Sequence, residues 1–356
     1  MTRVFALRLV WLSAVSSLTV ATAGCGNLDY AFSAIAGQFR LLSSVEPIEV
    51  ALEDPSLSEE QRDKLAFVVR VRDYAEHVIG LNAGDSYRSF ANLGDEPLAW
   101  NLSAARKDAF EAYFWDLPLV GSLPYLGFFD YDQALAERDR LVDEGWDTLV
   151  YEVDAYSTIG LLPDPLTSAL LRRDRISLAD TVMHELLHNT IFKPGETTFN
   201  ESMATFVGRQ AGLEFLEFEY GAGSDVLVEA HRNYQDEDRH AAFIAGLIAK
   251  VRALYDQDLS SEEKIAQREA IFESGRQRYA TEVLPYLHDR TGYETYTTFK
   301  YNNAFLLANV RYNNDQDVFA AVYEMTGRNW ADTLGIFAEA ANAPMPFQYM
   351  RDVLGY

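Results

Sequence analysis

The sequence predicts an α+β protein that is predominantly helical, with a small sheet in its first half and a helical lobe at its C-terminal end. Three observations support this class. Apolar residues recur at helical spacing from Leu57 to Leu81. Short runs of strand-forming residues lie on either side of one helical segment between residues 98 and 153. From Ile176 almost to the C-terminus the apolar pattern is helical again.

The first half of the chain gives the elements in order. A Ser-Glu-Glu run before Leu65 is typical of a helix start, so we predict a helix over Leu57–Leu81. Residues 82–131 are rich in Gly, Pro and aromatic residues. Within and after them we expect strands at Leu98–Leu102, Leu126–Phe129 and Thr148–Val153, and a helix at Asp132–Glu144.

The second half is predicted to be helical, and the chain to form one compact unit. The helical stretches are Val226–Tyr255, Ser261–Tyr286 and Asn302–Met325, broken by Gly and Asp/Asn clusters. We find no internal repeat and no low-complexity linker. The predicted organisation is a signal segment at 1–24, an N-terminal α/β lobe at 25–160, a pair of metal-binding helices at 161–215 and a helical lobe at 216–356.

Composition excludes several classes of protein. The chain has 356 residues, 48% of them hydrophobic, which is ample for a packed core. Its formal charge of −24 would repel nucleic acid and anionic lipid, so we expect no nucleic-acid partner. A single Cys cannot form an internal disulfide or a Cys-rich zinc module. Any metal must therefore be held by His, Asp or Glu.

The N-terminus predicts export. Residues 1–24 carry two Arg and no acid, followed by an apolar stretch and a small-residue end at Ala23-Gly24, as in a secretory signal. The only Cys, Cys25, follows at once and resembles the lipid-attachment site of bacterial lipoproteins, although Thr22 departs from that pattern. We expect a lipoprotein of the cell envelope, anchored through a lipid at Cys25. Gly26 as the next residue favours attachment to the outer membrane, with the protein facing the periplasm. The alternative is an ordinary signal with an incidental Cys.

The motif that carries chemistry is H-E-x-x-H, formed by His184, Glu185 and His188. Residues four apart share one face of a helix, so both imidazoles can reach one zinc ion, and Glu185 can face a water bound to it. Apolar neighbours indicate a buried helix, for which Ser177 is the expected cap and Pro194-Gly195 the stop. The alternative is a pair of satisfied core histidines.

A catalytic zinc needs a third protein ligand and an open position for water. Glu201 is the preferred candidate, because a short turn after the first helix would bring a second helix back antiparallel and aim Glu201 at the two histidines. Competing candidates are Glu196, which lies in the turn, and His231 and His240, which lie on a later charged helix.

These residues carry a family resemblance. The run H-E-L-L-H, twelve further residues and Glu201 within F-N-E-S-x-A-T resemble a bacterial family of predicted zinc aminopeptidases, usually lipoproteins, in the gluzincin class. The likeness extends over nearly the whole mature chain. It includes Gly84–Arg88, Trp100-Asn101, Ala155–Gly160, Asp164–Leu166, Gly195–Thr197, the stretch around Tyr255 and Asn302–Ala304. It implies a zincin-like metallopeptidase fold, with His184, His188 and Glu201 as zinc ligands and Glu185 as base.

Two departures from better understood gluzincins accompany the resemblance. Thr205 stands where some of them carry an Asp that orients a histidine, and a G-x-M-E-N-type acidic anchor for a free amino terminus is absent. A developing oxyanion would need a further donor. Our first candidate is Tyr156, which follows the last predicted strand, and Asn302 and Asn303 are candidate substrate-binding residues.

Three functions remain open from the sequence. The leading hypothesis is a zinc peptidase, in particular an aminopeptidase, that hydrolyses peptides at the envelope. The second is a zinc amidase that acts on another envelope amide. The third is a non-catalytic binding or scaffold lipoprotein with a structural or vestigial metal site, which the intact Glu185 argues against.

Overall fold

The computed structural model describes residues 25–117, 121–155, 158 and 162–356. They divide into two compact units, with the boundary between Arg40 and Leu41. Helix α2 (Cys25–Ser43) supplies the described part of the first unit and continues across that boundary. All other described elements belong to the second unit, which contains every candidate catalytic, metal-binding and substrate-binding residue.

Helix α4 (Glu59–Tyr74) confirms the first predicted helix. Ser58 and Gln61 form a reciprocal capping box at its start, which satisfies backbone donors that a helix leaves unpaired. After Tyr74 the helix widens into the π-helical turn η2 (Ala75–Ile79), which ends at Gly80 with φ 89°, a conformation natural to glycine. Its buried side packs against helix α6, so α4 supports the helix on which the candidate site is built.

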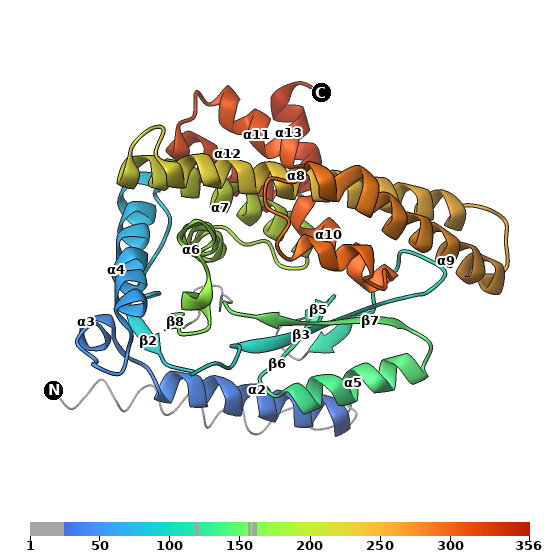
Figure 1. Cartoon of the computed structure of the whole chain (residues 1–356), viewed down its shortest axis with the longest axis horizontal. Helices are drawn as coiled ribbons and strands as arrows, with labels where there is room; N and C mark the ends of the chain where they lie inside the picture. Colours follow the sequence, from blue (N-terminus) through green and yellow to red (C-terminus); the bar gives the residue numbers. More distant parts are fainter. Residues whose placement is uncertain (1–24, 118–120, 156–157, 159–161) are drawn as a thin grey trace. The chain divides into compact units, whose positions relative to one another are not determined.

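The principal sheet has the antiparallel order β6-β3-β7, as the predicted strands and the helix between them suggest. Its strands are β3 (Ala99–Ala105), β6 (Leu126–Phe128) and β7 (Asp147–Val153). Helix α5 (Tyr131–Asp143) covers one face, and helix α10 (Asn303–Asn313) lies on the other face, between the sheet and helix α8 (Asp225–Tyr255) (Figure 1). This layering brings α10, from the C-terminal third of the chain, against the sheet.

Shorter elements connect these layers. A second sheet, β1-β2-β8, pairs β1 and β2 antiparallel and β2 and β8 parallel, and β4 and β5 form a hairpin. Their bounds, with those of the short helices, are β1 Glu46–Pro47, β2 Ser89–Ala91, β4 Trp115–Leu117, β5 Gly121–Leu123, β8 Leu166–Thr167, α3 Ile48–Ala51, η3 Leu170–Arg172, η4 Tyr279–Val283, η5 Leu284–Tyr286 and η6 Tyr293–Thr297.

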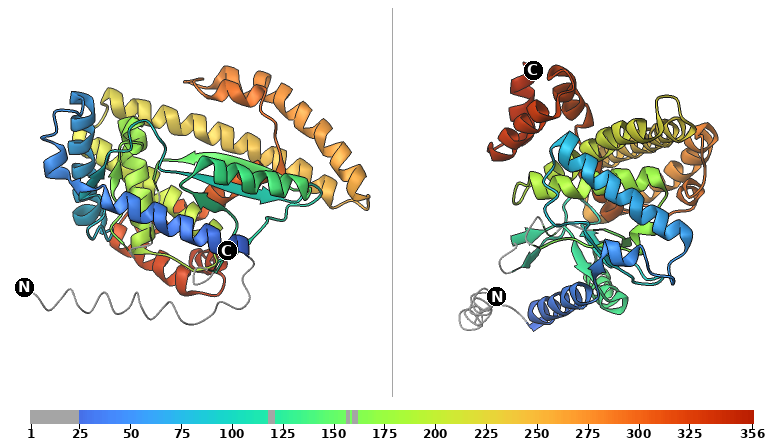
Figure 2. Two further views of the ribbon diagram at one scale, coloured as in Figure 1. Left: turned by 90° about the horizontal axis from the view of Figure 1, so that it is seen from below. Right: turned by 90° about the vertical axis from the view of Figure 1, so that its left-hand side faces the viewer.

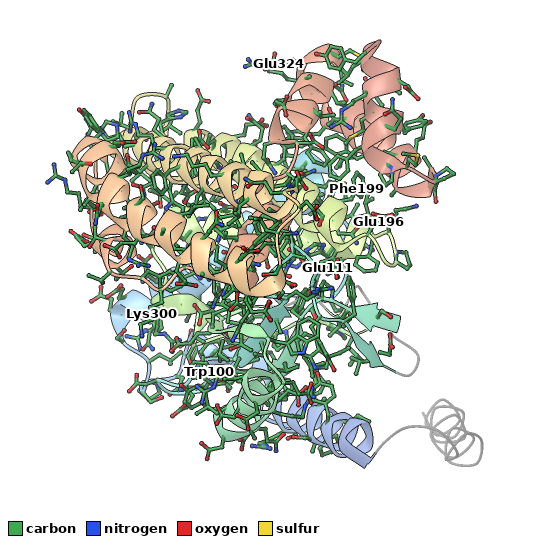
Figure 3. The ribbon with its side chains drawn as sticks, turned by 90° about the vertical axis from the view of Figure 1, so that its right-hand side faces the viewer. Trp100, Glu111, Glu196, Phe199, Lys300 and Glu324 are labelled. Carbon is green, nitrogen blue, oxygen red and sulfur yellow. The ribbon has the colours of Figure 1, made fainter. Side chains whose placement is uncertain are left out.

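The central core is built around the helix pair α6 (Arg175–Thr190) and α7 (Thr197–Tyr220). The helices α11 (Gln316–Met325), α12 (Trp330–Asn342) and α13 (Pro346–Leu354) gather beside α7 (Figure 2). Phe199, labelled in Figure 3, packs edge to face on Phe347 and tilted on Phe319 of this group. A second core lies between α8, α9 (Ser261–Arg278) and the start of α10.

The structure confirms the coarse fold class, a mostly helical α+β chain with small sheets. It corrects two details. The capping residue of α6 is Asp174, whose carboxylate accepts from the backbone N–H of Ser177, and the hydroxyl of Ser177 donates to the same carboxylate. The predicted helix Asn302–Met325 is split at Asn314 and Asp315, where Asp315 has φ 52°.

Among the described residues, no helix combines the length and apolar character that a membrane crossing requires. The segment 1–24 lies outside the described residues, so the signal prediction is not tested by the structure.

Candidate metal centre

The two histidines of the motif lie one turn apart on α6 and face the next helix. Their Nε2 atoms are 3.3 Å apart, and Glu201 on α7 places its Oε2 3.3 Å from Nε2 of His184 and 3.7 Å from Nε2 of His188. All three side chains are at least 86% buried. The structure therefore brings together the three residues that the sequence singled out, and within the described chain they are the one His/Cys/Asp/Glu cluster with metal-ligand spacing.

The spacing of these atoms fits a metal ion. Two ligand atoms at zinc distances of about 2.0–2.1 Å in tetrahedral directions are about 3.3–3.4 Å apart, close to the three distances observed. Two imidazole nitrogens and a carboxylate oxygen are also the donor set of a catalytic zinc site. Nitrogen atoms that face each other at 3.3 Å share at most one proton between them, so a cation satisfies all three groups better than hydrogen bonding does.

Close packing of α6 and α7 makes this convergence possible. A Cβ atom on Gly208 would lie 2.9 Å from the backbone oxygen of Asp180 and 3.2 Å from Cβ of His184. One turn further along α7, Gly212 faces the backbone of Asp180 at 3.4 Å. Two small residues one turn apart let the helices approach at the level of the first histidine, so Gly208 fixes how far His184 stands from Glu201.

The turn between the helices is held by the residue before Glu201. Asn200 is 2% exposed, and its side chain accepts from the backbone N–H of Lys193 and donates to the carbonyl of the same residue, at 2.9 and 2.8 Å. The Lys193 ammonium donates in turn to carbonyls of Ala341 and Ala343 near the end of α12. Asn200 thus closes the turn and fixes the start of α7, on which Glu201 sits.

The residue after Glu201 is held from the other side. The hydroxyl of Ser202 donates to the carbonyl of Arg311, and the Gln316 side chain donates to the carbonyl of Ser202, each at 2.8 Å. Glu201 therefore sits between two anchored neighbours, which limits the rotation of its helical turn. These roles of Asn200 and Ser202 were not predicted, and for Ser202 the reason is that its partners are remote in sequence.

The pKa values of the cluster residues are set by burial and by the charges of their neighbours. Burial alone would lower the pKa of His184, but the carboxylates of Glu201, Glu185 and Asp180 outweigh that effect and raise it. Burial works against ionisation of Glu201, yet hydrogen bonds to the two histidines hold its pKa well below the usual range. In the absence of a metal, a proton on His184 balances Glu201. A divalent cation would take the place of that proton.

Glu185 is enclosed beside the ligands without belonging to them. Burial raises the pKa of its carboxyl group, the two histidines oppose that shift, and Glu201 adds to it. The loop at 84–88 lies along the same side of α6, since the side chain of Asn189, one turn beyond Glu185, donates to the hydroxyl of Ser86. In that loop Tyr87 is 2% exposed and has φ 57°, an unusual conformation for an aromatic residue.

The remaining sequence candidates lie elsewhere or outside the described residues. Glu196 precedes α7 in the exposed turn (Figure 3), and His231 and His240 lie on α8. The imidazole of His240 contacts the Tyr279 hydroxyl, and burial lowers its pKa to about 4. Tyr156 lies outside the described residues, and the side chain of Cys25 is likewise not described.

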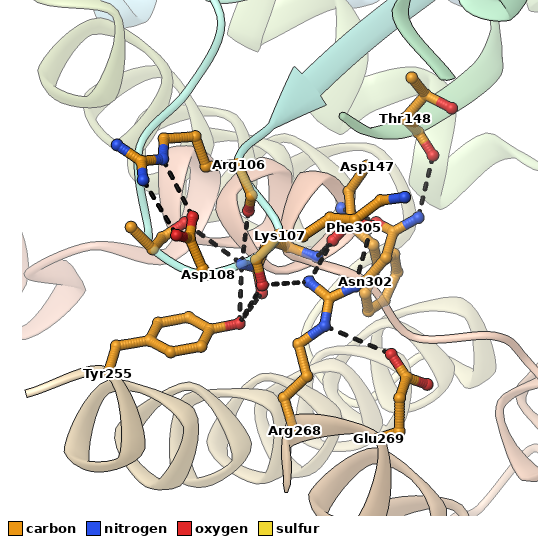
Figure 4. Close-up of polar contacts among 12 residues, drawn as sticks. Arg106, Lys107, Asp108, Asp147, Thr148, Tyr255, Arg268, Glu269, Asn302 and Phe305 are labelled. Carbon is orange, nitrogen blue, oxygen red and sulfur yellow. Dashed lines mark hydrogen bonds and ion pairs between the residues drawn. The ribbon is translucent and has the colours of Figure 1, made fainter. Parts of the chain in front are cut away.

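Asn302 and Asn303 stand at the start of α10, in a buried junction drawn in Figure 4. Asn302 caps the helix by accepting from the N–H of Phe305, and it donates to the carbonyl of Thr148. Asn303 is 0% exposed, and its side-chain amide donates to the hydroxyl of Tyr255. Nine residues further along, Tyr312 stacks on His184 with ring centroids 6.3 Å apart. The two asparagines are therefore about 13 Å further along the helix axis, and the structure does not bring them to the cluster.

Two imidazoles, a carboxylate and a half-buried glutamate beside them give this site the donor set of a candidate metal-dependent hydrolase. The family is assigned from a match that extends over most of the chain. Residues 29–346 match the family model described as "Putative aminopeptidase", so the chain belongs to this family, and membership supports a peptidase. No curated protein and no solved structure matches the chain.

Proposed function

We propose that the protein is a zinc-dependent aminopeptidase with a zincin-like catalytic fold. The observation that carries the proposal is the spacing of 3.3, 3.3 and 3.7 Å among Nε2 of His184, Nε2 of His188 and Oε2 of Glu201, with Glu185 enclosed beside them. Membership of the family adds the expectation of a peptide substrate and of action at an amino terminus.

The three cluster residues would hold the ion, and bound zinc would acidify a water molecule and polarise the scissile carbonyl. Glu185 would accept the proton of the attacking water and deliver it to the leaving amine. A general base works best when its pKa lies near the operating pH, and the burial that raises the pKa of Glu185 moves the group in that direction. His184, His188 and Glu201 are held rigidly by helix packing, so little reorganisation is needed when a substrate enters.

The proposed site of action is the cell envelope. Export through the segment 1–24 and lipid attachment at Cys25 would tether the enzyme, with peptides in the periplasm as substrates. A zinc amidase that cleaves another envelope amide would use the same residues, so the choice of substrates in an activity assay separates the two. A structural or vestigial metal site has no need of Glu185.

The test compares the wild-type enzyme with Glu185→Gln in zinc content and in hydrolysis of a peptide library. We expect about one zinc per chain in both proteins and a loss of peptide hydrolysis of about 10²–10⁴-fold in the variant, the usual contribution of a general base. Cleavage of free peptides, but not of N-acetylated ones, would assign the aminopeptidase activity. Absence of zinc, or equal activity of the two proteins, would contradict the proposal.

A further inference from the structure

Arg311, near the C-terminal end of α10, is a buried cation that no carboxylate neutralises within the described residues. It is 5% exposed, and its Nη2 donates to the hydroxyl of Ser103 at 2.9 Å. Nη1 is enclosed and has no hydrogen-bond partner in the described chain. Burial of a guanidinium without an acidic partner is costly. An anion supplied from outside would compensate that cost.

This cation is attached to the candidate metal centre. The carbonyl of Arg311 accepts from Ser202, the residue next to Glu201, and the ring of Tyr312 stacks on His184. The end of α10 thus touches both helices that carry the cluster. Neither Glu185 nor Glu201 forms an ion pair with the guanidinium in the described structure. Glu201 pairs with the two histidines, and Glu185 lies beside them.

Two phenols, those of Tyr125 and Tyr312, lie near Arg311 and near the cluster. The ring of Tyr125 lies over the guanidinium, with 5.3 Å between Cζ and the ring centroid. Burial raises the pKa values of Tyr125 and Tyr312, the negative charge of Glu201 raises both further, and Arg311 lowers both. Each phenol is therefore close enough to both Glu201 and Arg311 for their charges to affect its pKa. Neither hydroxyl has a hydrogen-bond partner in the described part of the chain.

We propose that Arg311 is a substrate-binding residue that pairs with a carboxylate of the peptide, so that the preferred substrates are short peptides which present a free carboxylate a few residues from the scissile bond. Nη1 is the unpartnered nitrogen that binds this carboxylate. The partly exposed Tyr125 ring, which lies against the guanidinium, turns aside as the substrate enters. The unpartnered hydroxyls of Tyr125 and Tyr312 add two donors on the same side. A guanidinium and two phenols form a donor-rich surface, which matches an acceptor-only group.

This inference rests on the proposed peptidase function but is tested by binding, which does not require turnover. The protein is the zinc-loaded full chain carrying Glu185→Gln, and calorimetry measures its affinity for Leu-Gly-Gly and for the same peptide with an amidated C-terminus. We expect the free carboxylate to bind about 10–100-fold more tightly, the range for a hydrogen bond to a charged group. Glu-Gly-Gly-amide and Gln-Gly-Gly-amide form a second pair that tests a side-chain carboxylate in place of the terminal one.

Replacement of Arg311 decides the assignment. Arg311→Met should abolish the preference for a carboxylate while affinity for the amidated peptide and zinc content stay unchanged, and Arg311→Lys should retain part of the preference. Arg268→Lys, at another buried arginine, is the matched control and should leave the preference intact. If neither peptide pair shows a preference, or if Arg311→Lys and Arg311→Met weaken both members of a pair equally, the inference is wrong. A clear preference in a wild-type enzyme that hydrolyses no peptide would instead contradict the proposed function alone.

Discussion

Two buried polar clusters in this protein differ in whether their charges are matched from within. In the junction at the start of α10, Asp147 accepts from both terminal nitrogens of Arg268, at 2.6 and 3.0 Å, and from the backbone N–H of Asn303 (Figure 4). The third nitrogen of Arg268, Nε, has no hydrogen-bond partner in the described chain, but it lies 3.3 Å from the carboxylate of Glu269 as an ion pair. Tyr255 and the carbonyl of Lys107 complete the network.

The metal-centre cluster at the other end of α10 has no such balance. His184, His188 and Glu201 direct acceptor atoms at one point, Nδ1 of His188 has no partner in the described chain, and Arg311 stands nearby with an unused arm. We call the junction network saturated in the sense that each of its charges has an opposite charge beside it, so it has no charge left for a ligand and serves the fold. The cluster region holds a buried guanidinium without an ion pair in the described chain, and a ligand could offset the cost of that burial. Matching of charge thus separates the two regions more sharply than burial does, since both are buried.

The largest effect is expected when the anionic residue of the candidate metal site is removed. Glu201→Gln should lower zinc affinity by more than the roughly 10–100-fold that loss of an outer partner of a ligand costs, and peptide hydrolysis should fall to background. Zinc content and hydrolysis rate measure both changes. Glu196→Gln, in the turn just before α7, is the matched control and should bind zinc like the wild type. Equal loss in the two variants would show that the cluster is not the metal site.

Breaking the saturated network should act on stability alone. Arg268→Met leaves the carboxylate of Asp147 buried without its partner, which should cost about 3–5 kcal/mol of unfolding free energy. Denaturant titration measures the loss, and the folded variant should keep its zinc. The exposed pair of Arg328 and Glu324 offers a comparison, because Arg328→Met should cost no more than about 1 kcal/mol. Loss of zinc from folded Arg268→Met would remove the distinction between the regions.

A smaller change tests the packing beneath the metal site. Gly208→Ala places a methyl group against Asp180 and His184, so we expect about 1–3 kcal/mol of destabilisation from overpacking together with weaker zinc binding as the helices separate. Gly335→Ala is the control, since that helical glycine has open space around it and should be neutral or stabilising by up to about 1 kcal/mol. Unchanged zinc affinity in Gly208→Ala would mean that helix spacing does not govern the site.

The smallest expected effect lies within the saturated network. Tyr255→Phe removes a hydroxyl that donates to the carbonyl of Lys107 and pairs with Asn303, and should cost about 0.5–1.5 kcal/mol for each hydrogen bond lost. Thermal unfolding beside Tyr286→Phe, which alters an exposed ring, measures it. Hydrolysis per folded molecule should not change. A loss of activity in Tyr255→Phe would instead connect the junction to catalysis.

The sequence predicted the parts of this molecule that depend on local spacing. His184, His188 and Glu201 lie within two neighbouring helices, and a period of four on a helix with a short return turn suffices to bring them together. The three strands of the principal sheet were predicted from short runs of strand-forming residues, and most of the longer helices from apolar period. Asn302 was a candidate substrate-binding residue, and the structure shows it as the cap of α10.

What the sequence could not reveal depends on contacts between distant segments. Arg311 meets Ser103 across 208 positions, and no local pattern marks either residue. Tyr87 looks like an ordinary aromatic residue until its backbone conformation and burial are known. Gly208 and Gly212 are spaced by four residues and so lie on one helix face, which is a recognisable pattern. The pattern alone does not show which helix packs against that face, so the close approach to α6 could not be predicted. The prediction for Tyr156 is untested, because that residue lies outside the described part of the chain.

The short separation of the metal-binding residues has a consequence for how the chain folds. His184 and Glu201 are 17 positions apart, whereas Asp147 and Arg268 are 121 apart. Closing the shorter loop costs less chain entropy, so the helix pair can form its site before the sheet and the long helices have met. A metal ion present at that stage would stabilise the α6–α7 hairpin first, and the rest of the fold would then assemble around an element already in place. Under the proposed export, metal supply in the receiving compartment would in that case set the yield of folded protein as well as its activity.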